Sequence, residues 1–251
     1  DLKSVTAPNT RMMKNYVTTA TALIDESDTP DTDVLVFVHA LEGIVAAQRN
    51  GGEHQYCRQH EHEKSRLGGI GNNERAVAEK RFGKICMVHL NVFWTRPQAY
   101  YDQGHGWRGT WEFDGGAFMN QASHYVDLLD WLIGPVDKVQ AMMSTTRDIE
   151  VEDTGVLNIK WRNGALGSMS VTMLTYPQNL EGSITILGEK GSVRVGGVAV
   201  NDIQLWQFDE PKEYDEQVKQ ASYETTSVYG FGHPLYYQNV IDVLQGETEP
   251  E

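Results

Sequence analysis

A succession of short strand-like segments, separated by tight turns, fills the second half of the sequence. These segments lie near Lys138–Ser144, Gly155–Trp161, Ala165–Met173, Ser183–Leu187, Ser192–Val195 and Ile203–Phe208. Two of the connections, Arg162-Asn-Gly164 and Gly188-Glu-Lys-Gly191, have the glycine-containing composition of hairpin turns. Because hairpins join antiparallel neighbours, this half of the chain predicts a mostly antiparallel sheet.

The region before these strands supplies one more strand, a loop and a helix. Lys84–Phe93 is predicted to be a strand, and it leads into an aromatic, arginine-containing loop at Trp94–Tyr101. A helix is expected over about Ala117–Leu132. A last helix is expected over Leu235–Leu244, and Gly246 ends it. The helix over Ala117–Leu132 is the one long helix expected to accompany the sheet.

The first third of the chain has a different pattern. Val34–Val38 is continuously apolar, as expected for a strand buried on both faces. Leu41, Ile44 and Val45 follow at helical spacing, and Gly51 ends the helix. A strand followed at once by a helix is the repeating unit of a parallel, doubly wound sheet.

Charge and apolar content exclude two classes of partner. The chain has 21 basic and 35 acidic residues, a net charge of −14. Nucleic-acid binding depends on clustered Lys and Arg, so no nucleic-acid partner is expected. The longest apolar run is far shorter than the roughly 20 residues of a membrane span, so no membrane partner is expected. Two cysteines outside any CxxC motif, and the lack of a readable signal peptide, favour a cytoplasmic location.

The most informative stretch runs from Trp107 to Asp127. Asp114 precedes two glycines, and its side chain is predicted to cap the helix that follows. Within that helix Asn120, His124 and Asp127 stand at i, i+4 and i+7, so they are expected to share one face. The pattern alone does not show that these residues act in catalysis. His124 could equally be a hydrogen-bonded structural histidine, and Asp127 could anchor neighbouring backbone.

The same residues resemble a motif of the Gfo/Idh/MocA family of sugar and inositol dehydrogenases. In that family a glycine run precedes an acid or amide, then a histidine four residues later, then another acid; here these are Gly115-Gly116, Asn120, His124 and Asp127. The resemblance covers about Phe82–Glu251. It implies NAD as the cofactor, His124 as the general base, and substrate binding by the other two polar residues. A neutral imidazole, with an ordinary pKa of about 6.5, accepts a proton near pH 7.

The amide of Asn120 narrows the implied substrate, because most family members have an aspartate there. The Asn form, with the segments Asn91–Tyr101 and Trp107–Asp127, is similar to members that oxidise nucleotide-linked amino sugar acids. The resemblance therefore implies a UDP-linked N-acetylglucosaminuronic acid as the small-molecule substrate. Its C3 hydroxyl would be oxidised to a ketone, a step in O-antigen and lipopolysaccharide biosynthesis.

The implied fold has two domains of the α/β class. A partial Rossmann-type parallel-sheet domain that binds NAD is expected at residues 1–80. A substrate-binding α+β domain with an open, mostly antiparallel sheet is expected at residues 81–251. No GxGxxG turn precedes Val34, although a dinucleotide-binding domain normally begins with a strand and this turn. Segments of the first domain are therefore expected to be missing from the sequence.

Three residues of the first domain receive roles from the same resemblance. Asp1 would accept hydrogen bonds from the adenine ribose and favour NAD over NADP; the alternative is an exposed terminal residue. His39 directly follows the strand that in the family runs into a Thr-Pro-x-x-x-His turn, and it is assigned to cofactor binding. Lys64, within Glu63-Lys64-Ser65, is the candidate for the family's catalytic Glu-Lys-Pro lysine, which contacts the reacting hydroxyl.

Further residues are expected to bind the substrate. Arg96 and Arg108 are assigned to its anionic groups, because a guanidinium matches phosphate or carboxylate. Either arginine could equally form a surface ion pair. Tyr100, Tyr101 and His233 are pocket residues by resemblance, and ordinary half-buried aromatic residues otherwise.

The resemblance also implies a homo-oligomer. Family members are commonly oligomers, so a dimer or tetramer is expected. The exposed face of the sheet is the surface expected to make the subunit contacts.

Three rival functions stay open. The first is a family member that oxidises a free sugar or inositol, and the second is a non-catalytic sugar-nucleotide binding protein. The third and weakest is a metal-dependent hydrolase. His54, His60 and His62 lie close together in the sequence, but their spacing fits no strong zinc pattern, so no metal is expected.

Overall fold

The computed structural model describes residues 69–225 and 232–247. The helices in these ranges are α4 (Gly69–Ala78), α5 (Gln98–Asp102), α6 (Gly116–Met119), α7 (Ser123–Ile133), α8 (Asp215–Lys219) and α9 (Gly232–Gln245). The strands are β1 (Ile85–Phe93), β2 (Val136–Ser144), β3 (Thr154–Trp161), β4 (Leu166–Thr172), β5 (Glu181–Gly188), β6 (Gly191–Gly196) and β7 (Asp202–Phe208). The predicted strand Val34–Val38 and the helix after it lie outside the described residues.

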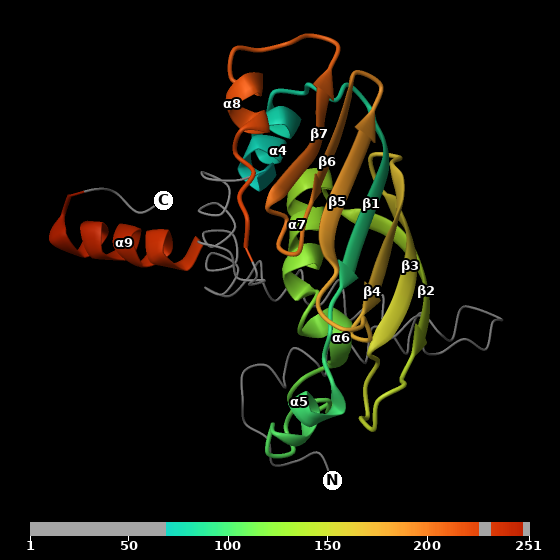
Figure 1. Ribbon diagram of the computed structural model, residues 1–251. Coiled ribbons are helices and arrows are strands. Elements are labelled where there is room, and N and C mark those ends of the chain that lie inside the picture. The colour runs from blue at the N-terminus through green and yellow to red at the C-terminus, as the bar shows by residue number, and fades with distance from the viewer. Residues whose placement is uncertain (1–68, 226–231, 248–251) are drawn as a thin grey trace.

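The strands form one open sheet in the order β2-β3-β4-β1-β5-β6-β7 (Figure 1). β1 and β4 are parallel, and every other neighbouring pair in this sheet is antiparallel. All seven strands fall on predicted segments, which confirms the mostly antiparallel sheet. Both predicted hairpins form, and in the first of them Gly164 has a φ of 90°, a backbone conformation that favours glycine.

The hydrophobic core lies on one face of this sheet. Residues along β3 alternate, with Leu157, Ile159 and Trp161 buried and those between them exposed. Helices α4, α7 and α8 lie on the buried side (Figure 1), and α4 contacts both α7 and β6. Leu128 of α7 is fully buried there, which contributes about 1.5–3 kcal/mol to folding. Among the described residues, no helix is both long and apolar enough to cross a membrane.

The predicted helix Ala117–Leu132 is wrong in one respect, because it is two helices. Residues 120–122 form a turn between α6 and α7. The Ala122 N–H donates to the carbonyl of Ala117, five residues back, which interrupts the i→i−4 pattern. Asn120, with φ −104° and ψ −83°, is not helical. It therefore does not share a helix face with His124.

The predicted cap of this helix is also wrong. The residue before α6 is Gly115, which has a φ of 75°, and no side chain of that residue caps the helix. The carboxylate of Asp114 accepts hydrogen bonds elsewhere, from the Gly109 N–H at 2.6 Å and from the amide of Asn120. An Asp close before a helix often caps it, because its carboxylate accepts the free N–H groups of the first turn. Here Gly115, not Asp114, is the residue directly before α6.

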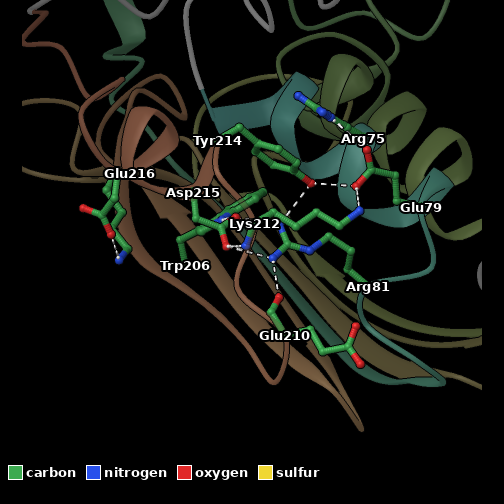
Figure 2. Close-up of polar contacts among 10 residues, drawn as sticks. Arg75, Glu79, Arg81, Trp206, Glu210, Lys212, Tyr214, Asp215 and Glu216 are labelled. Carbon is green, nitrogen blue, oxygen red and sulfur yellow. Dashed lines mark hydrogen bonds and ion pairs between the residues drawn. The ribbon is translucent and has the colours of Figure 1, made fainter.

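A buried ion pair ties the segment after α4 to α8 (Figure 2). Arg81 donates to both carboxylate oxygens of Asp215, at 2.6 and 2.8 Å, and the Trp206 indole donates to the same carboxylate at 2.8 Å. The two charged side chains are 4% and 12% exposed. The Arg81 guanidinium holds the pKa of Asp215 well below its usual range. Around this pair, Glu79 accepts hydrogen bonds from Tyr214 and from a lysine.

Candidate functional site

Three connections gather at one end of the sheet. Residues 94–122 follow β1, residues 145–153 join β2 to β3, and residues 173–180 join β4 to β5. Backbone hydrogen bonds connect them: the Arg96 N–H donates to the Met173 carbonyl at 2.8 Å, and the Glu150 N–H donates to the Gly109 carbonyl at 2.9 Å. Helices α5 and α6 lie at this end (Figure 1), and the Arg81–Asp215 pair lies at the other end of β1 and β7.

Two arginines and a tyrosine from the first connection form a cationic cluster. The guanidinium carbon of Arg108 lies 4.1 Å from the centre of the Tyr100 ring, and that of Arg96 lies 5.3 Å from it. Arg108 also donates to the Tyr100 carbonyl at 2.9 Å. Neither guanidinium forms an ion pair within residues 69–225 and 232–247, so the surface ion-pair alternative finds no support there.

Tyr101 packs against the Tyr100 ring of this cluster. Its side chain is buried and meets the Tyr100 ring edge-on, with 5.1 Å between ring centres. Burial first, and then the nearby Asp153 and Asp114 charges, raise the pKa of Tyr101 to about 12. The phenol is therefore neutral near pH 7, and we interpret Tyr101 as a residue that packs against Tyr100 and does not contribute charge to the cluster.

Asn120 lies in the turn between α6 and α7. Its N–H donates to the Gly116 carbonyl at 2.9 Å, and its own carbonyl accepts from the Ser123 hydroxyl at 2.7 Å. Its side-chain amide donates to the Asp114 carboxylate, and the side chain is half-buried. Both the backbone and the amide of Asn120 are thus fixed.

Four residues further on, His124 stands in the first turn of α7. Its side chain is exposed and not enclosed by packed aliphatic side chains. An exposed imidazole at this end of the sheet is accessible to a ligand. Asp127 lies one turn further along α7 and is only 2% exposed, which favours its anchoring alternative over direct contact with a sugar.

Glu152 is a residue of the site that the sequence did not single out. Its Oε1 accepts the Phe118 N–H at 3.1 Å, and its carbonyl accepts the Ala117 N–H at 3.0 Å. This glutamate, from the connection between β2 and β3, thereby holds the start of α6. The side chain is 6% exposed, and burial raises the pKa of Glu152 to about 7. The one signal in the sequence is the glycine pair at 115–116, which permits a close approach without identifying the partner.

Four assigned side chains are outside the described part of the chain. Asp1, His39 and Lys64 lie outside the described residues. His233 belongs to α9, but its side chain is also outside the described part of the chain. No three His, Cys, Asp or Glu side chains among the described residues could hold a metal ion. The histidine-rich stretch 54–62 lies outside that part.

The open sheet with helices on one face defines the C-terminal alpha/beta domain of an oxidoreductase family. The family profile described as oxidoreductase family, C-terminal alpha/beta domain (Gfo/Idh/MocA) matches residues 74–251. This match covers well over half of the sequence, and the chain belongs to the Gfo/Idh/MocA oxidoreductase family. No curated protein matches the chain.

Two solved structures of WlbA dehydrogenases are similar to this chain. The one from Chromobacterium violaceum is 70% identical over 72% of this chain and 50% of its own, with a TM-score of 0.64. The one from Bordetella pertussis is 65% identical over 75% of this chain and 55% of its own, with a TM-score of 0.69. Both are complexes with NADH and UDP-GlcNAcA. The chain spans about half the length of these two proteins.

A more distant structure shares the fold alone. An oxidoreductase domain protein from Kribbella flavida is 19% identical over 75% of this chain and 56% of its own, with a TM-score of 0.53. At this identity the similarity concerns the arrangement of the strands and helices. It carries no information about the ligand.

Proposed function

We propose that the chain is part of an NAD-dependent dehydrogenase that oxidises the C3 hydroxyl of a UDP-linked N-acetylglucosaminuronic acid to a 3-keto sugar. One observation carries this proposal. The domain that is 65–70% identical to WlbA structures with NADH and UDP-GlcNAcA holds an exposed His124 in the first turn of α7 and a fixed Asn120 in the turn before it. The connection after β1 also holds two arginines, Arg96 and Arg108, with no carboxylate partner in the described residues.

Each residue has a role in this reaction. His124 accepts the proton of the C3 hydroxyl as the C3–O bond becomes a carbonyl. Asn120 holds the sugar by a hydrogen bond. Arg96 and Arg108 bind the anionic groups of the substrate, which a guanidinium matches in charge and geometry. Lys64 orients the hydroxyl before reaction.

The cofactor assignment rests on the same family. NAD+, when bound, accepts the hydrogen and electron pair that leave C3. The described domain fits this division of labour, because it offers an exposed imidazole as proton acceptor. Asp1 and His39 are proposed to contact the NAD itself, with Asp1 favouring NAD over NADP.

A homo-oligomer completes the proposal. The sheet face opposite the helices carries exposed apolar side chains, among them Met142, Val156 and Leu166. Burial of such side chains between subunits is favourable. We propose this face as the contact surface of a dimer or tetramer. The two cysteines outside any CxxC motif suit a protein of the reducing cytoplasm.

The test is the formation of NADH, followed by absorbance, when the protein is mixed with NAD+ and UDP-GlcNAcA. We expect NADH to form with this substrate, and the product to carry a ketone at C3 by mass spectrometry and NMR. NADP+, free N-acetylglucosaminuronic acid and inositol serve as parallel reactions. Turnover of a free sugar or inositol with no reaction of the UDP-sugar would overturn the proposal in favour of another family activity. Binding of the UDP-sugar without any turnover would identify a non-catalytic binding protein.

A further inference from the structure

The carboxylate of Asp114 connects two parts of the site. One oxygen, Oδ2, accepts the backbone N–H of Gly109 at 2.6 Å. The other, Oδ1, accepts the side-chain amide of Asn120. Asp114 is 8% exposed, so both bonds form in a largely dry environment where they hold their partners firmly. Since Gly109 directly follows Arg108, this carboxylate joins the cationic cluster to the Asn120 turn.

This contact fixes which end of the Asn120 amide is offered to a ligand. An ionised carboxylate only accepts hydrogen bonds, so the amide must turn its Nδ2 toward Asp114. The amide oxygen is then directed to the other side. Within the described residues, Asn120 Oδ1 accepts no hydrogen bond, and the side chain is only half-buried. Asn120 therefore presents its amide oxygen, a hydrogen-bond acceptor, on the side away from Asp114.

The same contact explains why an amide, and not a carboxylate, occupies position 120. An aspartate there would place two carboxylates within hydrogen-bond distance, and both could not be ionised together. With Asn120, every polar atom between the two side chains has a complementary partner. Positions 114 and 120 are thus chemically matched.

We propose that Asp114 is a positioning residue that fixes Asn120 as a hydrogen-bond acceptor for the sugar. The proposal rests on the proposed function. The reacting C3 hydroxyl has a single proton, which goes to His124. The group that donates a hydrogen bond to the Asn120 amide oxygen is therefore a neighbouring ring substituent, either the C4 hydroxyl or the N–H of the C2 acetamido group. Position 120 then selects sugars that carry a donor beside the reacting carbon.

Asp114→Asn tests this directly. The new amide must still accept the Gly109 N–H with its oxygen, so its NH2 faces position 120. The Asn120 amide then turns around and offers its own NH2 to the sugar. We expect the KM for UDP-GlcNAcA to rise about tenfold, as for one lost hydrogen bond, with a smaller change in kcat because His124 is unchanged.

The double variant Asp114→Asn/Asn120→Asp is the matched rescue. Here the carboxylate introduced at position 120 accepts the amide introduced at position 114 with one oxygen and offers the other oxygen to the sugar. We expect its KM to return to within about threefold of the wild-type value, which is under 1 kcal/mol. Asn120→Asp alone places the same carboxylate beside Asp114 and should remain impaired. A double variant as impaired as Asn120→Asp overturns the proposal, even if Asp114→Asn does not fold.

A second readout does not depend on turnover. In the 15N-labelled wild-type protein, one side-chain amide proton of Asn120 should exchange slowly and shift when Asp114 is replaced by Asn. Identical Asn120 amide signals in the two proteins would overturn the proposal. If the wild-type protein does not oxidise UDP-GlcNAcA, the proposed function fails, and these amide signals alone decide whether Asp114 orients Asn120.

Discussion

The carboxylate of Glu152 occupies the space that a side chain at Gly116 would need. A Cβ atom built on Gly116 would overlap both carboxylate oxygens of Glu152. Gly116 also has a φ of 86°, which L side chains rarely adopt. The absence of a side chain at this glycine therefore lets a glutamate from the β2–β3 connection reach the first amides of α6.

Gly116→Ala should destabilise the protein by about 3 kcal/mol or more. The strained backbone costs roughly 1–3 kcal/mol, and displacement of the Glu152 carboxylate leaves the Phe118 N–H without its acceptor. Gly106→Ala is the matched control, since Gly106 has a φ of 82° but no atom within 4 Å of an added Cβ. Chemical denaturation of both variants gives the comparison. Equal losses in the two variants would mean that the Glu152 contact contributes nothing.

Ionisation of Glu152 should make stability depend on pH between about 4.5 and 7. Burial raises the pKa of Glu152 from 4.5 to about 7 in the folded protein. In this window the folded state binds more protons than the unfolded state, so the free energy of unfolding falls as the pH rises. The loss amounts to about 3 kcal/mol above pH 7. Glu152→Gln keeps the acceptor for Phe118, and its unfolding free energy should fall less over this range. Parallel pH profiles for the two proteins would contradict the prediction.

The strands could be predicted from the sequence because their signals are local. Alternating apolar residues in β3, and turn residues such as Asn163-Gly164, fix strand and hairpin within a few positions. Hairpin pairing then accounts for the runs β2-β3-β4 and β5-β6-β7, but the position of β1 between β4 and β5 was not predicted, because it depends on pairing between strands distant in sequence. The short helix α8 was missed, because its five residues have no long apolar period.

The site was only partly predictable, because its geometry depends on contacts distant in sequence. The sequence singles out Asn120 and His124 as candidates, but their i, i+4 spacing predicts a single helix where the chain has a turn. The start of α6, just before this turn, is held by Glu152, which lies more than 30 residues away in sequence. In the sequence, Glu152 is one acid among 35 and resembles a solvated loop residue. Its burial is a tertiary effect that no local pattern contains.

Replacement of Arg81 should lower the free energy of unfolding far more than replacement of a surface ion-pair partner. Arg81→Met leaves Asp215 buried without its cation, and this typically costs about 3–5 kcal/mol. Arg81→Met/Asp215→Asn should recover part of the loss, because it removes the stranded charge. The control is Asp137→Asn, which breaks the exposed pair with Lys160 at 3.6 Å and should cost roughly 0–1 kcal/mol. Thermal and urea unfolding measure all three, and a single variant no worse than the control would contradict the prediction.

Arg108→Lys should weaken substrate binding although it keeps the positive charge. The guanidinium carbon of Arg108 lies 4.1 Å from the centre of the Tyr100 ring, and the guanidinium donates a hydrogen bond to the Tyr100 carbonyl. An ammonium group cannot reproduce this planar geometry. We expect the KM for UDP-GlcNAcA to rise about tenfold with little change in kcat. Arg162→Lys, in the exposed turn at the other end of β3, is the control and should leave KM unchanged. An unchanged KM in Arg108→Lys would remove this arginine from the substrate site.

Replacement of His124 should abolish most of the turnover while binding persists. A general base contributes about 10²–10⁴-fold to the rate, so His124→Asn should lower kcat by at least about 100-fold. The side chain is exposed, so the substitution leaves the core untouched, and the Kd for UDP-GlcNAcA should stay close to the wild-type value. His89→Gln is the control, because His89 bonds Ser168 on the sheet face away from the helices and is given no role in the proposed reaction. Steady-state kinetics and calorimetric titration separate the two quantities. Normal turnover in His124→Asn would require another proton acceptor, and a parallel loss of kcat in His89→Gln would point to a general effect of histidine replacement on the fold.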